Sequence, residues 1–116
     1  MSIQTADKGP RATRRDHAWI DERSRALHTR IAEKLRENPS LLAVARDNLE
    51  HWERLRGTDA ALAEWSLLLD TMPFSDLLRL LTEESENADR LRQSSPFAGI
   101  LTADERMEVF RHYETL

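Results

Sequence analysis

The chain of 116 residues contains no cysteine, three glycines, four prolines and a single tyrosine. Without cysteine it has no disulfide framework, no thiolate metal site and no thiol nucleophile. No stretch approaches the ~18 consecutive apolar residues of a membrane span, and the N-terminus lacks the apolar core of a signal peptide. No run of β-branched residues reaches the length of a strand. These absences predict a helical protein of the cytoplasm, with no membrane contact.

Charge is abundant but unevenly distributed. Hydrophobic residues make up 40% of the chain and charged residues 33%, a composition typical of one helical domain. Residues 57–116 carry twelve acidic and five basic side chains, whereas residues 1–56 have a small basic excess. An acidic C-terminal half argues against a general nucleic-acid binder and is compatible with docking onto a basic protein. Charge that simply keeps a small domain in solution explains the same pattern.

The N-terminal half predicts a tail followed by two helices. Residues 1–17 show no helical periodicity and contain a Gly-Pro break, so we expect a flexible tail before a single helical domain at 18–116. Apolar residues spaced by seven, four and four predict a helix at 19–37, which must stop before Pro39. Asn38 is then expected to cap a second helix that has Pro39 at its first position and ends at Gly57.

Three or four shorter helices are expected after Gly57. A third begins after Thr58 and ends at Met72-Pro73, and Ser75 can cap a fourth at 76–82. The following residues could continue that helix or form a separate piece; we favour a break near residues 82–85. Thr102 and Glu105 have the spacing of a capping box and predict the start of the last helix. The fold class is therefore a compact all-α bundle of five or six helices, mostly antiparallel.

Side chains with catalytic or metal-binding chemistry are present but poorly arranged in sequence. Asp104, Glu108 and His112 recur every four residues, so they share a helical face that could hold a metal or orient a base. The stronger interpretation is a solvated face with weak pairing. Ser94 and Ser95 have no histidine near them in sequence and no GxSxG motif. We therefore predict no catalytic residues, no metal and no cofactor.

The tryptophans and the basic tail give weaker indications. Trp52 and Trp65 fall on apolar stripes and are expected in the core, whereas Trp19 is expected to be the most exposed. We predict no nucleic-acid binding except through the basic residues of the tail. A helix-turn-helix is disfavoured because the segment at 59–70 offers no Arg, Lys, Asn or Gln to base edges.

The segment at 85–106 is the least ordinary part of the chain. A helix there stops at the sequence QSSPF, which brings together an amide, two hydroxyls, a proline and an aromatic ring. One interpretation is structural: Phe97, Ile100 and Leu101 anchor the last helix, and the serines satisfy polar groups at the helix end. The other is that this proline-stiffened turn contacts a partner.

Two segments carry a family resemblance. They are residues 21–35, with the pattern D-x-x-S-x-A-L-H-x-x-I-A-E-K-L, and residues 85–106, with the pattern S-E-x-A-x-x-L-R-Q-S-S-P-F-A-G-I-L-T-x-x-E-R. Together they resemble a family of small helical bacterial proteins encoded beside a larger protein, in several cases a nucleotidyltransferase-like toxin. The resemblance covers about residues 20–110 and implies an antitoxin-like partner that holds a toxin inactive. The tail before Asp16 matches no part of this pattern.

The resulting prediction is a non-catalytic protein that neutralises a cognate toxin by direct contact. The residues expected at the partner interface are an acidic flank and the turn that follows it: Glu83, Glu84, Glu86, Arg90, Arg92, Gln93, Ser94, Ser95 and Phe97. Arg92 and Gln93 would hydrogen-bond the partner, and Phe97 would fill a pocket on it. The alternatives are a homodimeric helical regulator, a DNA-binding autoregulator that uses the tail, and a small enzyme built on Ser94 or Ser95.

Overall fold

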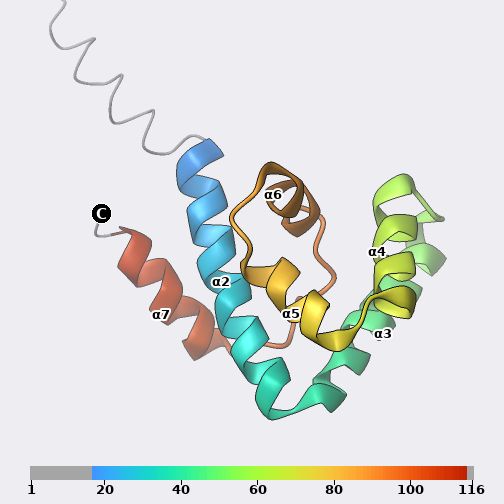
Figure 1. Cartoon of the computed structure of the whole chain (residues 1–116), viewed down its shortest axis with the longest axis horizontal. Coiled ribbons are helices and arrows are strands. Elements are labelled where there is room, and N and C mark those ends of the chain that lie inside the picture. Colours follow the sequence, from blue (N-terminus) through green and yellow to red (C-terminus); the bar gives the residue numbers. More distant parts are fainter. Residues whose placement is uncertain (1–16, 115–116) are drawn as a thin grey trace, which may run out of the picture.

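The computed structural model describes residues 17–114, and these residues form helices joined by short connections (Figure 1). In chain order the elements are α2 (His17–Glu37), the 3-10 turn η1 (Pro39–Leu41), α3 (Leu42–Arg56), α4 (Ala60–Thr71), α5 (Phe74–Thr82), α6 (Glu86–Arg92) and α7 (Ala103–Glu114). The predicted all-α class is confirmed. The predicted flexible tail lies outside the described residues except for His17, which belongs to α2.

Several helix ends follow the expected capping chemistry. Gly57 ends α3 with a φ of 77°, a left-handed conformation that glycine adopts without strain. The expected break after α5 is present, and Ser85 caps α6 by accepting a hydrogen bond from the Ala88 N–H at 3.1 Å. Thr102 and Glu105 make both bonds of a capping box, at 2.7 and 3.1 Å. The short connections therefore satisfy their own helix ends.

Asn38 and Pro39 hold the expected cap and first positions, here of the 3-10 turn η1, but the expected side-chain cap is absent, and the expected start of α5 is wrong. Asn38 caps no N–H group with its side chain, because the Ser40 hydroxyl donates to the Asn38 Oδ1 instead. Helix α5 begins at Phe74, two residues earlier than expected, with Pro73 rather than Ser75 at the cap position. The main chain explains the shift: the Pro73 carbonyl already accepts a hydrogen bond from the Leu77 N–H at 3.0 Å. Ser75 consequently lies within the helix.

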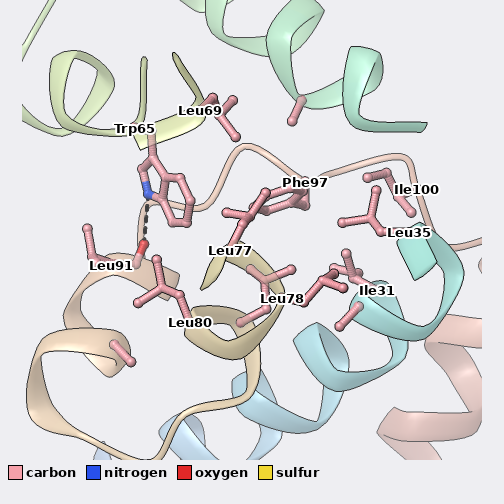
Figure 2. Packing of buried hydrophobic residues seen from close by; sticks show 14 of the residues in the cluster. Ile31, Leu35, Trp65, Leu69, Leu77, Leu78, Leu80, Leu91, Phe97 and Ile100 are labelled. Atoms are coloured by element: carbon pink, nitrogen blue, oxygen red, sulfur yellow. Dashed lines mark hydrogen bonds between the residues drawn. The ribbon is translucent and has the colours of Figure 1, made fainter. Parts of the chain in front are cut away.

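Helix α2 is the longest element and packs against α5, α6 and α7. The α3–α4 hairpin lies on one side of α2 and α5, and α7 lies on the other (Figure 1). Between the hairpin and α2, buried side chains of α2 to α6 and of the turn after α6 meet in one core, including Leu35, Trp65 and Phe97 (Figure 2). The Trp65 Nε1–H donates to the Leu91 carbonyl at 3.0 Å, so even the polar atom of this buried ring has a partner.

Candidate protein-binding groove

A groove of about 570 Å³ opens between the end of α3, the start of α4 and the turn after α6. The residues that line it, here called the QSS groove, are Trp52, Leu55, Arg56, Asp59, Ala61, Leu62, Gln93, Ser94 and Ser95. Three of the residues expected to contact a partner thus face a hollow on the surface. The other side of the hollow comes from the α3–α4 hairpin, about 40 residues away in sequence.

The walls of the QSS groove combine apolar surface with polar groups that have few internal partners. Leu55 is 68% exposed, the largest exposure among the big apolar side chains of the described residues. Trp52 is half-buried, and the Arg56 guanidinium stacks over its ring at 5.8 Å from the centroid. Gln93 is exposed, and within residues 17–114 its side-chain amide makes no hydrogen bond. These groups are available to bind something outside the chain.

The turn that carries Gln93, Ser94 and Ser95 is held in place through the residues that follow it. Pro96 is fully buried, and the Asn48 side-chain amide donates to the carbonyls of Pro96 and Ala98, both at 2.8 Å. Gly99 has a φ of 92°, which lets the chain reverse toward α7. The groove wall is therefore held in position before any partner arrives, which lowers the ordering cost of binding.

Arg92 does not belong to this surface, contrary to the prediction that it would contact a partner. Its side chain is 1% exposed and donates to the carbonyls of Leu80, Leu81 and Glu83 at 2.9, 3.3 and 2.8 Å. It also pairs with Asp89 at 2.6 Å. Because the last carbonyls of a helix lack partners within the helix, Arg92 caps the end of α5 with a buried cation. The fold uses this side chain internally.

Phe97 is likewise buried, at 1% exposure, so it fills a pocket in its own core and not one on a partner. Its ring meets the Trp65 ring edge-to-face, with the centroids 5.5 Å apart (Figure 2). It also meets the His28 ring edge-to-face, at 6.3 Å. Ile100 and Leu101 are buried beside it. The structural interpretation of this part of the turn is confirmed: its apolar residues anchor the chain before α7.

The acidic flank lies at the other end of α6. Glu83, Glu84 and Glu86 are all exposed around the connection between α5 and α6, and Glu83 accepts a hydrogen bond from Ser85 at 2.7 Å. Arg90 is exposed but already paired, with both its terminal nitrogens 2.9 Å from the Glu64 carboxylate on α4. That hydrogen-bonded pair lowers the pKa of Glu64 and raises the pKa of Arg90. The structure thus separates the nine predicted residues into the groove wall, the acidic flank, and residues engaged within the fold.

The remaining polar candidates lie on α7 and in the turn after α6. Asp104, Glu108 and His112 are exposed along α7, and within residues 17–114 no group of three or more histidines and carboxylates is placed to hold a metal. The Ser94 hydroxyl donates to the Leu91 carbonyl at 3.4 Å, and the Ser95 hydroxyl accepts from the Phe97 N–H at 3.3 Å. Both serines thus bond to main-chain groups.

His28 lies in the core, on the face of α2 that meets the turn after α6. It is 6% exposed, and its Nδ1 lies 2.7 Å from the Ser24 carbonyl. Burial lowers its pKa to about 4, with a further lowering from the positive charge of Arg92. The hydrogen bond to Ser24 opposes that shift. The ring is therefore neutral near pH 7 and acts as part of the core.

Sequence reasoning missed the hairpin side of the groove. Trp52 packs against the core as its helical face predicts, but it is only half-buried and also lines the groove. Leu55 and Arg56 follow it directly before Gly57. An apolar residue and an arginine in the last turn of a helix are common, so no local pattern identifies them as a binding surface. These residues are recognised as one wall of a groove only because the turn after α6 lies opposite them in the folded chain.

Comparisons with protein-family models, curated protein sequences and solved structures found no match for this chain. The class that the fold defines is an all-α helical bundle. No helix between residues 17 and 114 combines the length and apolar character needed to cross a membrane.

Proposed function

We propose that this chain is a non-catalytic, antitoxin-like protein that binds a cognate bacterial toxin and holds it inactive by direct contact in the cytoplasm. The observation that carries the proposal is the QSS groove, where Gln93, Ser94 and Ser95 face exposed apolar and cationic side chains of the α3–α4 hairpin. A preformed hollow with an apolar floor and a few polar groups is suited to receive a segment of another protein. The family resemblance in residues 85–106 points to a toxin of nucleotidyltransferase type.

The acidic flank supplies a second element of the proposal. Glu83, Glu84 and Glu86 are exposed and lie in the acidic half of the chain. Opposite charges on the two proteins speed and orient their encounter, so this flank would face the basic, RNA- or nucleotide-binding surface of the toxin. In such a complex, catalysis belongs to the toxin, and this chain only covers it.

Co-expression with the protein encoded by the neighbouring gene tests the proposal. We expect the neighbour to arrest growth when expressed alone, growth to recover when this chain is present, and the two proteins to co-purify. A harmless neighbour, or one that does not co-purify, contradicts the proposal. Light scattering of the isolated chain tests the homodimer alternative. Gel shifts on its own promoter, with and without residues 1–18, test the DNA-binding alternative.

A further inference from the structure

Arg56 is the only cation lining the QSS groove, and it makes no ion pair within residues 17–114. Its guanidinium is held over Trp52, which fixes its direction at low entropic cost. Asp59 is the one carboxylate among the lining residues, and it caps α4: its Oδ1 accepts a hydrogen bond from the Leu62 N–H at 2.8 Å. Asp59 keeps its negative charge but makes no ion pair with Arg56, so the five N–H donors of the Arg56 guanidinium are free of a carboxylate within residues 17–114.

Apolar surface lies directly beside this cation. Leu55 is 68% exposed, and Trp52 and Ala61 are half-buried around it. An apolar side chain from outside would remove water from Leu55 and from the open face of Trp52, which favours association. The neighbouring Arg56 would at the same time accept a carboxylate in a charge-assisted hydrogen bond.

The opposite wall offers hydrogen bonds and no charge. Gln93 has an exposed amide without an internal partner, and Ser94 is half-buried with one long bond at 3.4 Å. Such groups suit the main chain or a polar side chain of an extended or helical segment. A nucleic-acid backbone fits less well, because phosphate binding relies on several cations along a surface and this groove has one.

From these three features we infer that the QSS groove binds a short segment of a protein partner in which a large apolar side chain stands next to Asp or Glu. The apolar residue packs on Leu55 and Trp52, the carboxylate pairs with Arg56, and Gln93 bonds the polar edge of the segment. This inference rests on the proposed function for the identity of the partner. It adds the chemistry of the segment that the partner inserts.

A random peptide library displayed on phage and selected on the full chain tests this inference. We expect the enriched sequences to share a large apolar residue within one turn of Asp or Glu. A synthetic peptide of that consensus should bind about tenfold more weakly to Arg56→Glu and to Leu55→Asp, since each change removes or opposes one anchor. The Trp52 indole and Gln93 amide signals in the NMR spectrum should shift on titration with the peptide.

Arg54→Glu is the matched control, because Arg54 is an exposed arginine of the same helix that does not line the groove. It should change the affinity by no more than about twofold, as expected for a charge outside the contact. Exchanging the peptide carboxylate for lysine should restore binding to Arg56→Glu. Circular dichroism of each variant confirms that it is folded.

The inference is wrong if no sequence is enriched, if the enriched peptides lack the acidic residue, or if Arg54→Glu weakens binding as much as Arg56→Glu does. Tight binding of a fluorescent oligonucleotide that is lost in Arg56→Glu also contradicts it. Its failure is distinguishable from that of the proposed function. If a toxin still co-purifies with Arg56→Glu and Leu55→Asp, the proposed function holds and the groove is not its binding site. If the groove binds the peptide but the neighbouring protein is no toxin, the inference about the groove holds and the proposed function is wrong.

Discussion

Arg90 and Arg92 are two residues apart on α6 and have opposite environments. The Arg92 side chain is 1% exposed and the Arg90 side chain 56%. We expect Arg92→Met to lower the free energy of unfolding by about 3 kcal/mol, because it leaves Asp89 and three buried or half-buried carbonyls without their charged donor. Arg90→Met should lower it far less, because the ion pair between Arg90 and Glu64 is exposed to solvent. Urea titrations of both variants measure this difference, and equal losses would contradict it.

Phe97 was also expected to contact a partner, and its contribution to the core can be tested in the same way. Phe97→Ala should lower the free energy of unfolding by about 3–5 kcal/mol, since it opens a cavity beside Trp65 and Leu77. Phe97→Leu should cost less, because it keeps much of the volume and loses mainly the edge-to-face contacts. Denaturant unfolding followed by Trp fluorescence measures both values. A fully stable Phe97→Ala would restore the partner-contact interpretation of this ring.

Among the helical elements, α4 depends on the residue that caps its start, Asp59. Its sequence is apolar around much of its circumference, so helical patterning alone orients it weakly, and the Asp59 cap fixes where it begins. We expect Asp59→Ala to lower the free energy of unfolding by about 1 kcal/mol. Asp59→Asn should retain most of the stability, because the amide oxygen can accept the same Leu62 N–H. Thermal unfolding of the two variants checks the cap, and equal losses would assign the effect to charge instead.

The elements also show how far sequence reasoning reaches. The Gly57 end, the break before Ser85 and the capping box at Thr102 were predictable, because each depends on residues three or four positions apart. The start of α5 and the side chain of Asn38 were not, since a neighbouring main-chain or hydroxyl group competes for the cap. Arg92 and Phe97 were misplaced for a different reason. Their partners come from α5, α4 and α2, and an isolated sequence does not show these contacts.

On the scale of the whole molecule, α2 connects the core on one of its faces with α7 on another. His28 faces the core with Phe97 and Arg92, whereas Arg30 and Lys34 bind Glu105 at the start of α7, at 3.0 and 2.8 Å. The Lys34 Nζ also donates to the Ile100 carbonyl at 2.8 Å, directly after the turn that forms the groove wall. A loss of stability in α2 should therefore reach both α7 and the QSS groove.

Acid should reveal this connection in two steps. The folded-state pKa of His28 is about 4 and its unfolded value is 6.5, so folding favours the neutral ring. The stability that this provides is complete above pH 6.5 and is lost as the pH falls from 6.5 to 4, up to about 3 kcal/mol. The hydrogen bond from Lys34 is the main cause that lowers the pKa of Glu105 from 4.5 to about 2, so its contribution is lost below pH 4.5.

Urea unfolding at a series of pH values separates the two groups. Compared with the parent chain, His28→Leu should unfold with a shallower pH dependence between 6.5 and 4 and an unchanged one below 4. Glu105→Gln should flatten only the lower range. His51→Gln, which alters an exposed histidine on α3, is the control and should leave the upper range as it is. If His28→Leu keeps the full slope between pH 6.5 and 4, a different group is taking up the proton on unfolding, and the core is not what keeps this histidine neutral.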